Sequence, residues 1–146
     1  MAAARDLTLE LTGEVPAPRE AVWKALIEPD ELARWWGPSG FTTPSIELDL
    51  RVGGGYRFAM QPPEGEAFHL SGAFTEVEPP ARLAYTFIWD PPNPDDQETL
   101  ATLSLEEAGD STRLTLVQGP FATEERLALH RDGWTESLEK LASLFT

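Results

Sequence analysis

The sequence predicts an α+β fold in which a curved antiparallel sheet of about seven strands surrounds one long C-terminal helix, with two short helices after the first strand. Apolar and polar residues alternate through most of residues 46–118, which is typical of strands with one buried face. Near the C-terminus the apolar spacing changes to three and four residues, as in an amphipathic helix. No internal repeat or low-complexity tract divides the 146 residues, so we expect one domain over residues 1–146.

The N-terminal quarter of the chain predicts the first strand and both short helices. Leucines alternate with Thr and Glu over residues 7–12, which indicates a half-buried strand that Gly13 ends. Residues 19–27 place their apolar side chains on one face of a helix, and Pro29 ends that helix. A second short helix is expected to begin with Asp30 and Glu31 and to run to Trp36, because acidic residues in a first turn complement the helix dipole.

Six more strands follow from apolar residues spaced two apart, separated by glycine- and proline-rich turns. The residues expected to share the buried face are Ile46, Leu48, Leu50, Tyr56, Phe58, Met60, Phe68, Leu70, Gly72, Phe74, Leu83, Tyr85, Phe87, Trp89, Leu103, Leu105, Leu114, Leu116 and Gln118. The acidic, proline-rich segment 90–96 cannot form a strand and is expected to be an exposed tip.

The last helix has a clear start and a clear apolar stripe. Thr123 is expected to cap its N-terminus, and two glutamates follow in the first turn. The residues of the stripe that can lie against the sheet are Leu127, His130, Trp134, Leu138, Leu141 and Phe145.

Composition excludes several classes of function. The formal net charge is −14 and no cluster of Lys or Arg offsets it, so we expect neither nucleic acid nor a membrane surface as a partner. The absence of cysteine and the presence of only two histidines predict no metal and no cofactor. Residues 1–6 lack the apolar core of a signal peptide, and no later stretch approaches the roughly 20 apolar residues of a membrane span, so we expect a cytoplasmic protein. The sequence is compatible with either a monomer or a homodimer.

Five short motifs occur in order along the chain: PREAVW at 18–23, RWWGP at 34–38, LRVGG at 50–54, PPARL at 79–83 and GW at 133–134. Together they resemble single-domain bacterial proteins related to the activator of the heat-shock protein 90 ATPase, within the START-like, helix-grip (SRPBCC) superfamily. That superfamily also contains pollen-allergen-like proteins and polyketide aromatase/cyclases. The resemblance covers nearly the whole chain and implies a cavity between the sheet and the last helix. Gln118 departs from it, because such relatives often carry His near the end of the last strand.

An unusually large set of aromatic residues falls on the inward face of the predicted sheet and helix. Any one of these residues fits an ordinary core, and the set also fits the wall of a pocket for a small organic molecule. Gly133 lies inside the last helix, where glycine costs about 1 kcal/mol relative to alanine, so we expect it to leave room beside Trp134. The candidate ligand-binding residues are Trp35, Trp36, Phe41, Tyr56, Phe58, Met60, Tyr85, Phe87, Trp89, Gln118, His130, Trp134 and Leu138.

No residues form an evident catalytic constellation. His69 points away from the core by strand alternation, and His130 on the apolar stripe fits a buried structural histidine better than a general base. We therefore predict a binding protein for a small hydrophobic molecule, either a lipid, a polyketide or an aromatic metabolite. Two alternatives remain: an enzyme of the polyketide cyclase or aromatase type with Tyr56, His130 or Gln118 as polar participants, and a module that regulates a chaperone ATPase, with the chaperone as its partner.

Overall fold

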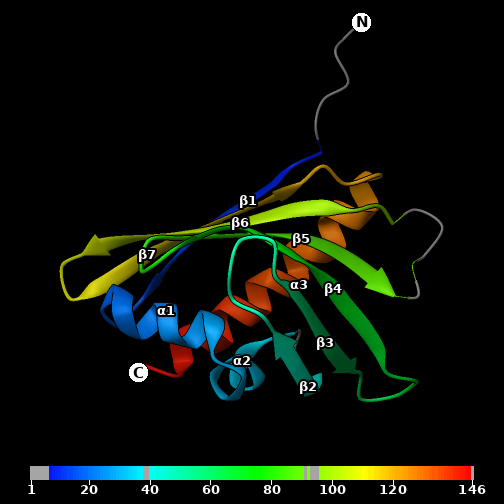
Figure 1. Ribbon diagram of the computed structural model, residues 1–146, viewed down its shortest axis with the longest axis horizontal. Helices are drawn as coiled ribbons and strands as arrows, with labels where there is room; N and C mark the ends of the chain where they lie inside the picture. The colour runs from blue at the N-terminus through cyan, green and yellow to red at the C-terminus, as the bar shows by residue number, and fades with distance from the viewer. Residues whose placement is uncertain (1–6, 38–39, 91, 93–95, 146) are drawn as a thin grey trace, which may run out of the picture.

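Seven antiparallel strands form one sheet that curves around the last helix (Figure 1). A computed structural model of the chain describes residues 7–37, 40–90, 92 and 96–145. The strands are β1 (Leu9–Val15), β2 (Thr42–Leu48), β3 (Gly55–Gln61), β4 (Phe68–Glu78), β5 (Arg82–Asp90), β6 (Thr99–Ala108) and β7 (Ser111–Gly119), in the sheet order β1-β7-β6-β5-β4-β3-β2. The helices are α1 (Arg19–Ile27), α2 (Pro29–Trp35) and α3 (Glu124–Ser143). This is the predicted α+β fold, with two short helices after the first strand.

The first strand is longer than predicted. It does not end at Gly13, which pairs with Leu114 of β7, and it continues to Val15. A glycine inside a strand is only weakly unfavourable when its backbone groups are paired, and pairing with β7 supplies those partners along the whole of β1. Leu9 and Val15 are both buried, as alternation requires.

The two short helices differ from prediction only at their boundaries. Pro29 begins α2 and does not merely separate the helices, because a proline in the first turn has no hydrogen bond to lose. Trp36 follows α2 as its C-terminal cap, and its backbone N–H donates to the carbonyl of Leu32.

The first strand of the hairpin formed by β2 and β3 ends earlier than expected. β2 stops at Leu48, so Leu50 lies in the turn and is half-buried there. Within this turn Gly54 lies so close to the carbonyl oxygen of Asp49 that an added Cβ would be 2.1 Å from it. Only glycine fits that position without a shift of the backbone.

A second glycine lets the sheet bend between β4 and β5. A Cβ at Gly72 would lie 1.9 Å from the carbonyl oxygen of Thr86, and the hydroxyl of Tyr56 donates to the same oxygen at 2.6 Å. A register shift between Phe74 and Glu76 follows two residues later. Glycine and a bulge at one place are the usual means of curving a sheet, and here they curve it toward α3.

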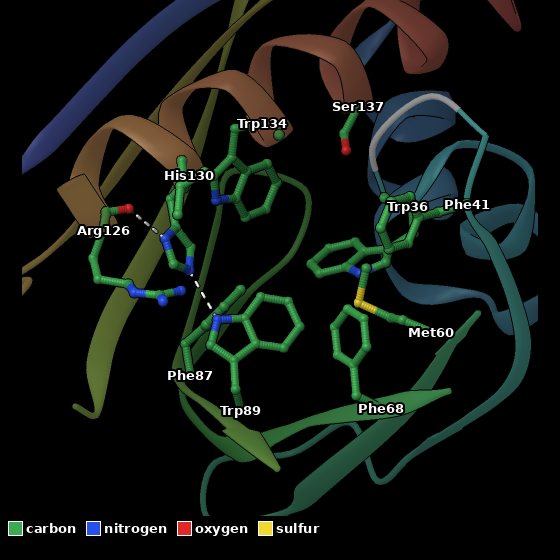
Figure 2. A pocket seen from close by; sticks show the side chains of 13 residues that line it. Trp36, Phe41, Met60, Phe68, Phe87, Trp89, Arg126, His130, Trp134 and Ser137 are labelled. Carbon is green, nitrogen blue, oxygen red and sulfur yellow. Dashed lines mark hydrogen bonds between the residues drawn. The ribbon is translucent and has the colours of Figure 1, made fainter. Parts of the chain in front are cut away.

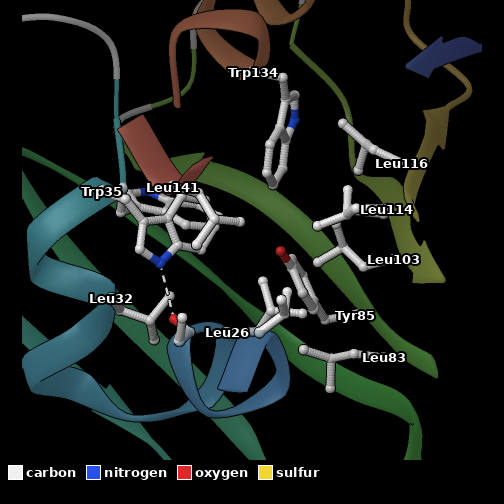
Figure 3. Packing of buried hydrophobic residues seen from close by; sticks show 14 of the residues in the cluster. Leu26, Leu32, Trp35, Leu83, Tyr85, Leu103, Leu114, Leu116, Trp134 and Leu141 are labelled. Atoms are coloured by element: carbon white, nitrogen blue, oxygen red, sulfur yellow. Dashed lines mark hydrogen bonds between the residues drawn. The ribbon is translucent and has the colours of Figure 1, made fainter. Parts of the chain in front are cut away.

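All three buried residues of the last helix lie in its C-terminal half: Trp134, Ser137 and Leu141. Thr123 is the predicted N-cap, since its hydroxyl accepts from the backbone N–H of Arg126 at 3.1 Å. Helix α2 packs against α3, and α1 packs against α2 (Figure 1). Figure 3 shows the apolar core there, which contains Leu26, Leu32, Trp35, Leu83, Tyr85, Leu103, Leu114, Leu116 and Leu141. In the N-terminal half of α3, Leu127 is only partly buried against the same cluster.

Two sequence predictions fall partly outside the described residues. The N-terminal segment 1–6 lies outside them, as do residues 91 and 93–95 of the predicted tip at 90–96. At the end of that tip, however, the side chain of Asp96 is only 4% exposed and lies 3.7 Å from the guanidinium of Arg126. The tip is therefore not exposed at Asp96, because an ion pair holds that residue against α3. Among the helices of the described residues, none has the length and apolar character to cross a bilayer.

Candidate functional site: a hydrophobic pocket

A pocket of about 450 Å³ lies between residues 126–137 of α3 and the concave face of the sheet (Figure 2). This volume is within the range of sites that hold small organic molecules. The residues that line it are Trp36, Gly37, Phe41, Met60, Phe68, Phe87, Trp89, Arg126, Leu129, His130, Gly133, Trp134 and Ser137.

One side of α3 forms a complete wall of the pocket. Its lining residues run from Arg126 to Ser137 at steps of one, three or four, so they share one helix face. The eleven steps from residue 126 to residue 137, at 1.5 Å per step, give this wall a length of roughly 16 Å. The opposite wall comes from Met60 of β3, Phe68 of β4 and two residues of β5. The pocket therefore lies between one face of α3 and three neighbouring strands.

Aromatic rings pack edge to face around the pocket. The ring centroids of Trp36 and Trp134 are 5.2 Å apart with an interplanar angle of 78°. The centroids of Phe87 and Trp89 are 5.3 Å apart at 85°, and Phe68 lies at 5.3 Å from Trp89. Edge-to-face contacts of this kind stabilise each ring beyond its burial.

Gln118 holds Trp134 in place from behind. Its side-chain carbonyl accepts from the indole Nε1–H of Trp134 at 2.7 Å, and its amide donates to the hydroxyl of Thr99 at 2.9 Å. Gln118 is fully buried, so both ends of its amide are satisfied by protein groups and none faces the pocket. Its role in the structure is to orient a wall residue.

His130 fixes the position of Trp89 in the same way. The indole N–H of Trp89 can only donate, so Nε2 of His130, 2.9 Å away, must be the unprotonated acceptor. Nδ1 of His130 then carries the proton and donates to the carbonyl of Arg126 at 2.7 Å. Burial lowers the pKa of His130, which agrees with a neutral ring. Because its lone pair is already occupied, His130 is not available as a general base in this arrangement.

The sequence-predicted residues divide into two groups. Those that line the pocket are Trp36, Phe41, Met60, Phe87, Trp89, His130 and Trp134. The remaining candidates, Trp35, Tyr56, Phe58, Tyr85, Gln118 and Leu138, lie outside it. Gly133, for which we expected room beside Trp134, does line the pocket.

Each residue outside the pocket has another place in the structure. Trp35 is fully buried in the core, and its indole donates to the carbonyl of Ala25 at 2.8 Å. Tyr56, Phe58 and Tyr85 surround a much smaller void of about 10 Å³, and burial raises the pKa of both tyrosines far above the ordinary value. Leu138 is half-buried and packs against the core cluster. Strand alternation predicts which face of the sheet a side chain occupies, but it does not predict which part of the covering helix lies over that side chain.

Sequence reasoning missed Gly37, Phe68, Arg126, Leu129 and Ser137 as wall residues. Phe68 had a signal, since its alternation with Leu70 placed it on the inward face. Arg126 and Ser137 are polar residues on α3 and fall outside the apolar stripe, so hydrophobic spacing alone could not find them.

The fold and the pocket define a START-like, helix-grip domain with a hydrophobic cavity under its last helix. The chain belongs to the family of activator of Hsp90 ATPase homolog 1-like proteins, whose model matches residues 16–146. No curated protein matches it significantly.

Several solved structures of bacterial proteins are similar over nearly the whole chain. A protein from Nitrosomonas europaea is 30% identical with a TM-score of 0.81, and the match covers 97% of this chain and 96% of that one. A protein from Chromobacterium violaceum is 29% identical with a TM-score of 0.82, covering 94% and 96%. The AHSA1 protein from Silicibacter pomeroyi is 32% identical with a TM-score of 0.80, covering 93% and 95%.

Proposed function

We propose that this protein binds a small hydrophobic or aromatic molecule in the pocket between α3 and the sheet. The observation that carries the proposal is the pocket of about 450 Å³ with aromatic side chains on both walls. Water in such a space makes few hydrogen bonds, so an apolar molecule that replaces it gains free energy. At about 25 cal/mol per Å², burying roughly 250 Å² of apolar ligand surface contributes about 6 kcal/mol before the cost of association.

The enzyme alternative has less support from the residues that suggested it. Tyr56 donates its hydroxyl to the carbonyl of Thr86 and lies outside the pocket. Gln118 uses both ends of its amide within the core, and the lone pair of His130 accepts from Trp89. The chaperone alternative rests on the family description alone. The rate of a chaperone ATPase, measured with and without this protein, tests that alternative.

The proposal is tested by fluorescence titration with 2-ethylnaphthalene and by native mass spectrometry of protein purified from its own cells. Gly133→Leu places a side chain in the pocket, whereas Thr135→Leu adds the same side chain on the exposed side of α3. We expect saturable binding to the natural protein, at least tenfold weaker binding to Gly133→Leu, and unchanged binding to Thr135→Leu. Equal affinity of all three proteins, or no saturable binding, would refute a ligand site in this pocket.

A further inference from the structure

Ser137 presents a hydroxyl to the pocket that the protein itself does not use. The residue is 5% exposed and lines the pocket, and its oxygen points away from α3 in Figure 2. Among the described residues, no hydrogen-bond partner of this hydroxyl occurs. Because this oxygen opens on the pocket and is not enclosed by protein, a molecule that replaces the water there is favoured when it supplies a hydrogen-bond partner.

Other hydroxyls on the same helix behave differently. Thr135 donates to the carbonyl of Arg131 at 2.7 Å, and Ser143 donates to the carbonyl of Glu139 at 2.9 Å. Bonding to the carbonyl four residues earlier is the usual arrangement for Ser and Thr inside a helix. For Ser137 that partner would be the carbonyl of Gly133, and the structure does not show this bond. The hydroxyl of Ser137 is thus available to a ligand.

A second donor lines the pocket. Trp36 is 5% exposed, and its indole N–H also lacks a hydrogen-bond partner among the described residues. An indole N–H donates only, and a hydroxyl donates or accepts. The ligand group that satisfies either one as a donor is a hydrogen-bond acceptor.

The positive charges near the pocket are already engaged. The guanidinium of Arg126 lies 3.7 Å from the carboxylate of Asp96, and Nζ of Lys140 donates to the carbonyl of Gly37 at 3.0 Å. The whole chain carries a formal net charge of −14, which disfavours an anionic ligand. An uncharged acceptor fits this environment better than a carboxylate.

We infer that the ligand is an uncharged, largely apolar molecule with a carbonyl oxygen that accepts a hydrogen bond from Ser137. Ketones, quinones, lactones and esters belong to this class. The inference rests on the proposed function and adds the chemical group that the pocket selects. Because a neutral hydrogen bond contributes modestly in a protein, the preference for the carbonyl is expected to be about three- to tenfold.

Three compounds of nearly the same shape test the inference: 2-ethylnaphthalene, 2-acetylnaphthalene and 2-naphthoate. For each compound, the affinity of the variant is divided by the affinity of the natural protein. This ratio is used because the three compounds differ in their free energy of transfer from water. Ser137→Ala removes the hydroxyl, and Ser143→Ala removes an exposed hydroxyl from the same helix. The infrared carbonyl stretch of bound 2-acetylnaphthalene reports the hydrogen bond directly.

We expect Ser137→Ala to weaken 2-acetylnaphthalene three- to tenfold, to change 2-ethylnaphthalene less than twofold and to shift the bound carbonyl stretch to higher wavenumber. Ser143→Ala is expected to change neither compound, and 2-naphthoate is expected to bind the natural protein at least tenfold more weakly than the ketone. If both neutral compounds bind but Ser137→Ala leaves their affinity ratio and the stretch unchanged, the inference is overturned and the proposed function stands. Tighter binding of the carboxylate overturns the uncharged class. If neither neutral compound binds, both proposals are overturned.

Discussion

Replacing Gln118 with methionine is expected to destabilise the protein strongly although the two side chains have similar size. Gln118 is fully buried and makes one hydrogen bond to Trp134 and one to Thr99. Methionine leaves the indole N–H and the hydroxyl without these partners, in places that water does not reach. An unsatisfied buried group costs about 1–3 kcal/mol, so the two together predict a loss of about 2–6 kcal/mol in the free energy of unfolding. Such a loss is a large part of the roughly 5–15 kcal/mol typical of a domain.

Urea denaturation followed by tryptophan fluorescence and by circular dichroism measures this loss. The matched control is Gln97→Met, because Gln97 is exposed and its only bond shown is to the carbonyl of Pro120. That variant is expected to change stability by less than about 0.5 kcal/mol. A double-mutant cycle with Trp134→Phe isolates the pair, and a coupling energy of about 1–2 kcal/mol is expected. A Gln118→Met protein as stable as the natural one, or a cycle without coupling, would show that this amide does not hold Trp134.

Three further outcomes follow from the geometry. Burial lowers the pKa of His130 in the folded protein, so below about pH 6.5 the unfolded chain binds a proton at this residue more readily than the folded protein does. The free energy of unfolding is therefore expected to fall as the pH drops from 7.5 to 5.5. His130→Phe should make this pH dependence weaker in urea titrations. Gly72→Ala is expected to lower the free energy of unfolding by more than about 3 kcal/mol, or to prevent folding, because the added Cβ meets the carbonyl of Thr86. Gly13→Ala has open space around it and should change the free energy of unfolding by less than about 1 kcal/mol. Similar urea midpoints for the two variants would contradict the close approach at Gly72. Gly133→Ala should raise stability by about 1 kcal/mol and weaken 2-ethylnaphthalene; higher stability with unchanged affinity would mean that this glycine does not serve the pocket.

Much of the fold could be predicted because each element buries one face. The strand from Leu83 to Trp89 illustrates this: its alternate residues Leu83, Tyr85 and Phe87 are all buried in β5. Where prediction was wrong, long-range pairing decided the outcome. Gly13 remains in β1 because β7 pairs with it, and nothing within residues 7–13 could reveal a partner about a hundred positions away.

The candidate site was less predictable than the fold. Tyr85 and Phe87 face the same side of β5, yet Tyr85 lies in the core under α2 and Phe87 lines the pocket. Which of them meets a cavity depends on where α3 stands away from the sheet. That separation depends on the bend near Gly72 and on the position of α2, which are properties of the whole assembly. The pocket-facing hydroxyl of Ser137 also depends on a rotamer, which hydrophobic spacing does not encode.

The walls of the pocket come from distant parts of the chain, so a ligand can be detected by its effect on the stability of the folded protein. Residues from position 36 to position 137 contribute to it, so no separate segment of the chain contains a binding surface. A molecule that occupies this space therefore interacts with the folded protein alone and raises its melting temperature, by an amount that grows with the logarithm of its concentration relative to its dissociation constant. At a hundred times its dissociation constant it adds about 2.7 kcal/mol to the free energy of unfolding. Thermal denaturation of the protein in the presence of metabolite fractions thus gives a direct means of finding its natural ligand.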